Sequence, residues 1–252
     1  MRIAYIGAVE FSLSMLEKLY ESNLDIVGVC TKSTSLFNSD HLDLSTFCET
    51  HSIPWVYSND INSNETYTWL TSLNPDVIFC FGWSQMIKEN ILGLPPLGVI
   101  GFHPASLPRN RGRHPIIWSL ALGLEKTAST FFFMDLSEDS GDIISQVDID
   151  IEVHDDAGAL YRKITESATR QLIEFLPKLE SGKIERFKQD LTYSNIWRKR
   201  NKLDGLIDWR MSAETINNLV RSLAAPYVGA HFYHKGAEIK VWKSTIATSS
   251  PA

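Results

Sequence analysis

The strongest constraint on the fold is an alternation, over the first hundred residues, of short apolar runs with segments of helical periodicity. The apolar runs are rich in β-branched and aromatic residues and are predicted strands: Arg2–Val9, Asp25–Thr31, Pro54–Ser58, Pro75–Gly82 and Leu97–His103. Helices are predicted between them at residues 11–22, 44–51 and 65–73. Strands that are apolar throughout must be covered on both faces. We therefore expect an α/β fold with a Rossmann-like, mostly parallel sheet.

The pattern changes after the fifth predicted strand. A helix is predicted at residues 115–123, and two extended segments, Thr127–Asp135 and Ile143–Ile151, flank a polar turn. A long amphipathic helix is predicted at Asp156–Leu179. A polar linker, a helix and a hairpin follow. We predict a main domain at residues 1–185, and a linker with a small C-terminal α+β module at residues 186–252.

Composition excludes several classes of function. The 252 residues carry a formal net charge of −6, and an acidic surface repels phosphate backbones, which argues against a general nucleic-acid partner. Cys30, Cys48 and Cys80 lie far apart and lack metal-ligand spacing, so we expect buried thiols at Cys30 and Cys80 and a reducing cytoplasm. No apolar run is long enough to cross a membrane.

The histidines show no HxxxH or HxH spacing, so no metal site is predicted. Five of them are expected on surfaces or in loops: His41, His51, His154, His231 and His234.

One stretch, "GFHPASLPRNRGRHP" at residues 101–115, is too rigid and too polar for a core strand or a helix. It ends the fifth predicted strand, and ligands of parallel sheets bind at the carboxyl ends of strands. His103 lies at that end, and Asp139 lies in the polar turn between the two later extended segments. A histidine beside a carboxylate is the smallest acid/base unit that works near neutral pH. The residues alone leave two interpretations equally open, this unit or a structural histidine with a capped loop.

These two stretches together resemble the formyltransferases that use 10-formyltetrahydrofolate. The resemblance is carried by His103–Pro108, by Arg111-Gly112 and by Asp139-Ser140-Gly141, and it extends over nearly the whole chain. The tail "IDWRMSAETINNLVRSLAAPYVGAHFY" is similar to the branch that formylates amino sugars. The resemblance implies the formyltransferase fold, with the catalytic domain at residues 1–185, and an N-formyltransferase activity that requires no metal.

The resemblance also implies site residues. His103 and Asp139 match the catalytic pair. The residues that match donor-binding positions are Gln85, Met86, Ile87, Arg113, Asp135, Leu136, Ser137 and Glu138. Asn110, Arg111 and the basic "WRKR" segment at residues 197–200 are predicted substrate contacts.

One position departs from the family pattern. An amine that attacks the formyl carbon generates an oxyanion, which needs hydrogen-bond donors fixed in advance. The family usually supplies an asparagine two residues before the catalytic histidine, and Gly101 stands there. The replacement donors we consider are Asn110, His114, a backbone N–H or a bound water.

The predicted acceptor is an amino sugar linked to a nucleotide, on the route to a surface glycan such as lipopolysaccharide. We expect a cytoplasmic homodimer with no nucleic-acid or membrane partner. Two alternatives stay open. One is an enzyme that resembles methionyl-tRNA formyltransferase, and the other is a non-catalytic folate- or sugar-binding relative.

Overall fold

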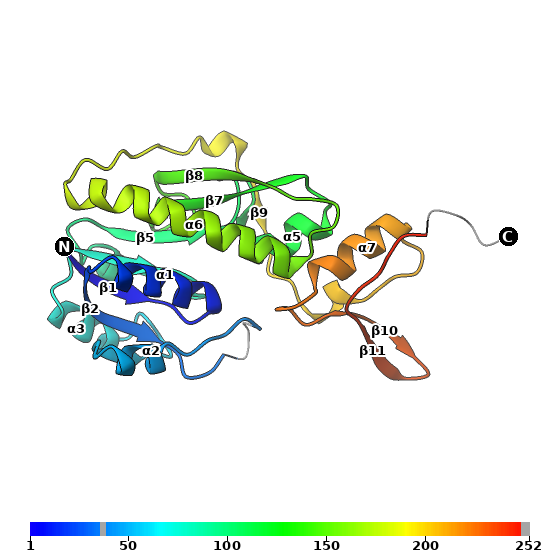
Figure 1. The fold of residues 1–252 in the computed structure, drawn as a ribbon, viewed down its shortest axis with the longest axis horizontal. Coiled ribbons are helices and arrows are strands. Elements are labelled where there is room, and N and C mark those ends of the chain that lie inside the picture. The colour runs from blue at the N-terminus through cyan, green and yellow to red at the C-terminus, as the bar shows by residue number, and fades with distance from the viewer. Residues whose placement is uncertain (36–38, 248–252) are drawn as a thin grey trace.

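Seven strands form one sheet in the computed structural model, which describes residues 1–35 and 39–247. They are β1 (Arg2–Ile6), β2 (Asp25–Thr31), β3 (Trp55–Tyr57), β4 (Val77–Cys80), β5 (Val99–His103), β7 (Lys126–Phe133) and β8 (Ile143–Asp150). Their order across the sheet is β3-β2-β1-β4-β5-β7-β8 (Figure 1). The first five strands run parallel, and β7 and β8 run antiparallel to their neighbours, so the predicted mostly parallel sheet is confirmed.

Helices cover both faces of this sheet. They are α1 (Glu10–Glu21), α2 (Ser45–Thr50), α3 (Asn64–Ser72), α4 (Glu89–Leu92), α5 (Pro115–Ala121) and α6 (Ala157–Glu180). On one face α1 and α6 lie side by side (Figure 1), and Leu16 and Leu172 join Phe79, Phe81 and Phe131 in the largest apolar cluster. On the other face, α3 and α4 cover the alternate strand residues in a second cluster. Period-2 alternation of fully buried side chains explains why the strands are apolar throughout.

The predicted helices and strands are mostly in place. The strand at Asp25–Thr31 has the predicted bounds, whereas the first strand ends at Ile6 instead of Val9. Beyond it the chain turns into α1, and Val9 forms an isolated bridge with His41. The short helix α4 has no counterpart among the sequence predictions.

The C-terminal segment contains η1 (Leu191–Tyr193), β9 (Ile196–Trp197), η2 (Lys202–Gly205), α7 (Ala213–Ser222), β10 (Ala230–His234) and β11 (Ala237–Val241). The predicted helix and hairpin are present, with left-handed Lys235 and Gly236 at the turn. The α7 helix packs on α5 through an apolar cluster that includes Ile117 and Val220. The division between residues 185 and 186 stays a prediction.

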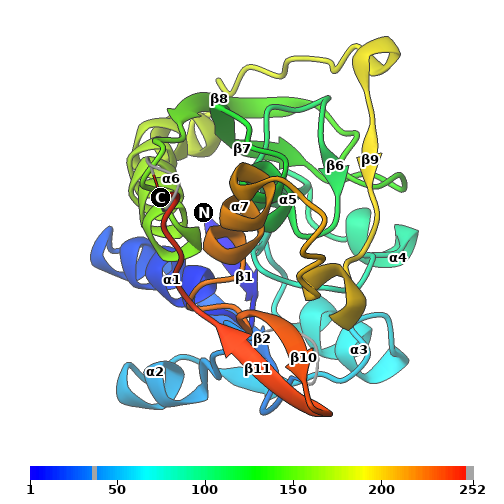
Figure 2. The same ribbon diagram turned by 90° about the vertical axis from the view of Figure 1, so that its right-hand side faces the viewer.

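One residue in this region lies where the sequence analysis did not expect it, and the predicted polar linker contains a strand that was not predicted. This strand, β9, pairs in parallel with β6 (Arg111–Gly112) in the segment after β5 (Figure 2). His231, expected on the surface, is 2% exposed. It lies in β10, where its carbonyl accepts a hydrogen bond from the Ile207 N–H, and burial lowers the pKa of its ring.

All three cysteines are buried and free, as predicted for Cys30 and Cys80. Within residues 1–35 and 39–247, no helix combines the length and the apolar character needed to span a membrane. The same residues contain no cluster of three or more His, Cys, Asp or Glu side chains that could hold a metal ion.

Candidate active site

His103 ends β5 and is only 4% exposed. Its Nε2 lies 2.7 Å from the backbone oxygen of Asn110. A carbonyl oxygen only accepts hydrogen bonds, so Nε2 carries the hydrogen and donates it. The other ring nitrogen, Nδ1, is therefore the one that can exchange a proton with a reacting group.

Asp139 faces that second nitrogen. Its Oδ2 lies 3.5 Å from Nδ1 of His103 and also accepts a hydrogen bond of 2.9 Å from the Gly112 N–H. The Gly112 bond orients the carboxylate toward the ring. The sequence analysis placed His103 at the end of a strand and Asp139 in a turn, and the fold brings the two side chains into contact.

The loop that carries Asp139 depends on a glycine. A Cβ atom at Gly141 would lie 1.7 Å from the Phe133 oxygen, so only glycine lets the chain return this close to the end of β7. Asp135 closes the other side of the loop, because its Oδ1 accepts hydrogen bonds from the Ser137 N–H and the Ser140 hydroxyl. The Asp-x-Gly spacing at residues 139–141 is thus a condition for this loop shape.

Arginines connect the loops around the site. Arg111 is buried and donates hydrogen bonds from Nε and Nη2 to the Glu138 oxygen, which ties the segment after β5 to the Asp139 loop. Arg113 donates from Nη1 to the Ser84 oxygen at 2.7 Å, which ties the same segment to the loop after β4. Arg111 was predicted to contact substrate. In this structure its guanidinium donates hydrogen bonds to the backbone carbonyl of Glu138.

Apart from Arg113, the predicted donor-binding residues lie on two loops, one after β4 and one after β7. Gln85 ties its loop to residues 59–61, because its side chain accepts a hydrogen bond from the Ile61 N–H and donates one to the backbone oxygen of Asn59. Ile87 is buried in the second apolar cluster, whereas Met86 and Leu136 expose 47% and 63% of their surface. Ser137 is also exposed. These positions stay predicted donor contacts.

The space beside Gly101 is filled. A Cβ atom there would lie 2.8 Å from Cγ of Met134 and 3.0 Å from Cζ of Phe132. These two side chains therefore occupy the volume that a side chain at residue 101 would need. A glycine therefore fits at position 101 in the packing of this chain, because its neighbours leave no room for a side chain.

Two of the replacement donors considered above can now be placed. Asn110 has a left-handed backbone with φ of 62°, and its Oδ1 accepts a hydrogen bond from Asn195. His114 is partly buried, and its Nδ1 accepts a hydrogen bond of 3.4 Å from the Arg200 N–H. Burial, with the neighbouring Arg113 charge, lowers the pKa of His114 from 6.5 to about 4. His114 is therefore neutral at neutral pH.

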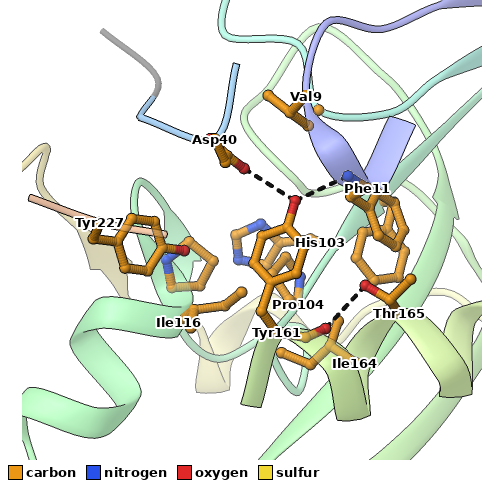
Figure 3. Close-up of a pocket in the computed structure, with 13 residues that line it drawn as sticks. Val9, Phe11, Asp40, His103, Pro104, Ile116, Tyr161, Ile164, Thr165 and Tyr227 are labelled. Carbon is orange, nitrogen blue, oxygen red and sulfur yellow. Dashed lines mark hydrogen bonds between the residues drawn. The ribbon is translucent and has the colours of Figure 1, made fainter. Parts of the chain in front are cut away.

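A cavity of about 170 Å³ reaches His103 from the side of α1 and α6 (Figure 3). Most of its wall is apolar, and its polar groups include Asp40 and Tyr161. The Tyr161 hydroxyl donates to Oδ2 of Asp40 at 3.0 Å and accepts from the Phe11 N–H at 2.9 Å. Burial raises the pKa of the Asp40 carboxyl. A mostly apolar hollow with a few fixed polar groups is typical of a small-molecule site.

The sequence analysis missed four residues around the site: Asp40, Tyr161, Gln189 and Asn195. Asp40 and Tyr161 meet across 121 residues of chain. Gln189 and Asn195 lie in the segment predicted to be an irregular linker. Each acts through a contact between distant parts of the chain, and no local motif marks such contacts.

The arginines of the "WRKR" segment form contacts with other residues of the chain. Arg198 forms an ion pair with Asp204, and Arg200 donates to the Asp204 oxygen and lies over the ring of Trp118. A substrate contact from this segment stays a prediction.

The chain matches the family model of formyl transferase over residues 1–176 and that of the formyl transferase C-terminal domain over residues 199–252. Methionyl-tRNA formyltransferase of Bacillus mycoides is 32% identical over 250 residues, which are 96% of this chain and 78% of that protein. The bifunctional polymyxin resistance protein ArnA of Wigglesworthia glossinidia brevipalpis is 37% identical over 200 residues, 79% of this chain. This chain matches only 31% of the length of that ArnA.

Among solved structures, an N-formyltransferase from Helicobacter canadensis in complex with folinic acid and dTDP-3-aminofucose shares the fold. Its TM-score is 0.76 at 17% identity, with 98% of this chain and 88% of that chain covered. Both domain models match in order, and together they leave only a short stretch between residues 176 and 199 unmatched. The chain therefore belongs to the formyl transferase family of enzymes.

Proposed function

We propose that this enzyme transfers a formyl group from 10-formyltetrahydrofolate to the amine of a nucleotide-linked amino sugar. The observation that carries the proposal is the contact of His103 with Asp139, beside a mostly apolar cavity that His103 lines. An acid/base pair placed there can manage the protons of an amine that enters through the cavity.

The cavity suits a sugar ring. A hollow of about 150 Å³ holds a benzene ring, so about 170 Å³ leaves room for a six-membered ring. Aromatic and aliphatic walls, among them Phe11 and Ile116, offer faces for the ring, and Asp40 and Tyr161 offer polar partners. The Helicobacter canadensis enzyme, whose fold is shared, was solved with an amino-sugar nucleotide.

The donor is expected on the side of Trp83 and Met86. The indole Nε1 of Trp83 is buried and has no hydrogen-bond partner among the described residues. An unpaired buried N–H is costly, so a bound polar ring that accepts from it would be stabilised. Trp83 directly precedes the loop that carries Gln85, and it packs in the same apolar cluster as Met134. When bound, the folate supplies an activated formyl group.

His103 and Asp139 then handle the protons. The Nε2–H of His103 is held by the Asn110 oxygen, so Nδ1 accepts the proton that the attacking amine loses. A proton on Nδ1 is stabilised by the Asp139 carboxylate 3.5 Å away. The same proton is available for the departing nitrogen. The hydrogen bond from the Gly112 N–H holds Oδ2 of Asp139 in place beside the ring.

The donor for the oxyanion is proposed to be the side-chain amide of Asn110. Its Oδ1 is held by Asn195, which fixes the plane of the amide and leaves Nδ2 to donate. Asn110 lies on the same segment as the other groups that contact the catalytic pair. It therefore replaces the family asparagine from another position in the chain, while Met134 and Phe132 fill the original place.

We further propose a cytoplasmic homodimer. Figure 1 shows the C-terminal module projecting beyond the sheet. Three large apolar side chains of this module are more than half exposed: Trp209, Tyr233 and Trp242. Exposed apolar side chains that gather on one module support a protein partner.

A panel of acceptors tests the function. Purified enzyme and 10-formyltetrahydrofolate are incubated with nucleotide-linked amino sugars, free amino sugars and methionyl-tRNA. Mass spectrometry then detects a product heavier by one formyl group. We expect product from a nucleotide-linked amino sugar in the wild type and none in Asp139→Ala. Product from methionyl-tRNA alone would contradict the proposed acceptor.

Methionyl-tRNA is the second candidate acceptor, because methionyl-tRNA formyltransferases match 96% or more of this chain. The charges argue against it. The chain is acidic overall, and the Arg198 and Lys202 side chains are paired with Asp204 and Glu238. Binding of tRNA that weakens steeply with salt would favour this candidate.

A further inference from the structure

We infer that the segment at residues 187–197, named the strap here, positions the catalytic pair, with Asn195 and Gln189 as its two positioning residues. The inference rests on the proposed catalytic role of His103 and Asp139. The strap connects α6 to the C-terminal module, and Figure 2 shows its β9 end beside β6. It touches the loops of both catalytic residues.

Asn195 holds the partner of His103. Its Oδ1 accepts from the Asn110 N–H at 2.9 Å, its Nδ2 donates to Oδ1 of Asn110 at 3.2 Å, and its own carbonyl accepts from the Arg111 N–H. The Asn110 oxygen in turn accepts from Nε2 of His103. Asn195 therefore fixes the direction of the carbonyl that sets the tautomer of the catalytic ring.

Gln189 holds the loop of Asp139. It is 6% exposed, and its Nε2 donates to the backbone oxygens of Asp139 and Gly141 at 3.0 and 2.7 Å. Phe187, two residues earlier, adds two backbone hydrogen bonds with Ile143 at the start of β8. The strap thus binds the Asp139 loop at its tip and at its base.

The two residues held in this way share a left-handed backbone conformation. Asn110 and Asp139 have φ of 62° and 49°, in the left-handed region that side-chain-bearing residues rarely occupy. Such conformations persist where surrounding contacts enforce them. Each of the two is hydrogen-bonded to one strap side chain, Asn110 to Asn195 and Asp139 to Gln189, so the strap helps to hold both conformations.

The close approach of the strap also explains why residue 112 is a glycine. A Cβ atom there would lie 2.4 Å from the Trp197 oxygen, and the φ of Gly112 is 101°. The Arg113 N–H donates to the same oxygen at 3.0 Å. The Arg-Gly element of the motif is therefore shaped to receive the strap while the Gly112 N–H binds Asp139.

The test compares Asn195→Ala and Gln189→Met with matched controls on the full chain. Asn201→Ala removes an exposed asparagine that caps η2, and Gln171→Met removes a buried glutamine whose Nε2 also donates two hydrogen bonds.

Asn195 is exposed, so its loss should leave the fold intact. We expect kcat to fall about 10- to 100-fold in Asn195→Ala and Gln189→Met, with little change in KM, because misplaced groups cost turnover. Asn195→Asp should recover only part of the turnover, because it keeps the acceptor for the Asn110 N–H but loses the Nδ2 donor that holds Oδ1 of Asn110.

The tautomer of His103 is the second readout, and it does not need an acceptor. NMR of histidine labelled at its ring nitrogens, assigned with His103→Gln, should show the hydrogen on Nε2 in the wild type. A mixture of tautomers should appear in Asn195→Ala but not in Asn201→Ala. An unchanged His103 signal in Asn195→Ala would overturn the role of Asn195, whatever happened to turnover. Equal losses of kcat in Gln189→Met and Gln171→Met would overturn the role of Gln189. If the wild type formylated none of the acceptors, the proposed function would be wrong, and the tautomer measurement would still test the role of Asn195.

Discussion

Nδ1 of His103 lies 3.5 Å from Oδ2 of Asp139, while its Nε2 is committed to the Asn110 oxygen. Nε2 therefore keeps its hydrogen on the backbone oxygen of Asn110, whereas Nδ1 faces the Asp139 carboxylate and can exchange a proton. The distance is longer than a tight hydrogen bond, as is common before substrate binds.

The first prediction concerns Asp139→Asn. The amide keeps an oxygen for the Gly112 N–H but cannot stabilise a proton on His103, so kcat should fall about 100- to 10,000-fold. The loop should stay folded, because Gly141 and Gln189 hold it independently. Steady-state kinetics and circular dichroism check this. Turnover within a few-fold of the wild type would contradict the role of Asp139.

The second prediction concerns the packed glycine. Gly101→Asn should lower the free energy of unfolding by about 1–3 kcal/mol, because the new side chain collides with Met134 and Phe132. Met134→Ala in the same chain makes room. The double variant should therefore be less destabilised than the sum of the two single variants in urea unfolding. Simple additivity would mean that Met134 does not occupy the space.

The third prediction concerns Asp40 in the cavity. Asp40→Asn keeps an acceptor for the Tyr161 hydroxyl but removes the charge, so KM for the acceptor should rise about tenfold. KM for the folate donor should not change. Asp43→Asn is the matched control, because Asp43 also accepts a tyrosine hydroxyl, from Tyr57, without lining the cavity. A rise in the donor KM instead would place the donor in this cavity.

The fourth prediction follows from the partly buried ring of His114, whose pKa is lowered from 6.5 to about 4. Between these values the unfolded chain takes up a proton that the folded chain does not. His114 therefore supports stability above pH 6.5, and this support is lost as the pH falls toward 4.

His114→Asn should flatten this dependence. Asparagine tolerates the left-handed φ of 58°, and the loss of stability between about pH 7 and pH 4 should shrink by on the order of 1–2 kcal/mol, allowing for partial exposure. Urea unfolding at several pH values measures it, with the exposed His154→Asn as control. Equal slopes in the wild type and His114→Asn would contradict the assignment.

Much of the sheet could be predicted because its strands carry a local signal. Continuous apolar runs marked the five parallel strands, and the stiff polar stretch after the fifth marked the position of His103. The pair with Asp139 followed from the family motif. The apolar pattern extended the first strand to Val9, where the chain had already turned toward α1.

The supports of the site could not be predicted, because they depend on polar contacts across long stretches of chain. Asn195 reaches Asn110 across 85 residues, and Gln189 reaches Asp139 across 50. A polar segment without periodicity indicates a loop, whichever surface it later contacts. The packing of Met134 against Gly101 is likewise a property of the folded β5–β7 pair.

Formyl transfer through His103 can be tested in one measurement. The wild type and His103→Gln are given 10-formyltetrahydrofolate and the acceptor selected from the panel, and both the tetrahydrofolate released and the formylated amine are quantified. Equal amounts of the two products should form with the wild type, and neither with a folded His103→Gln. Wild-type product yields from His103→Gln would contradict the proposed mechanism.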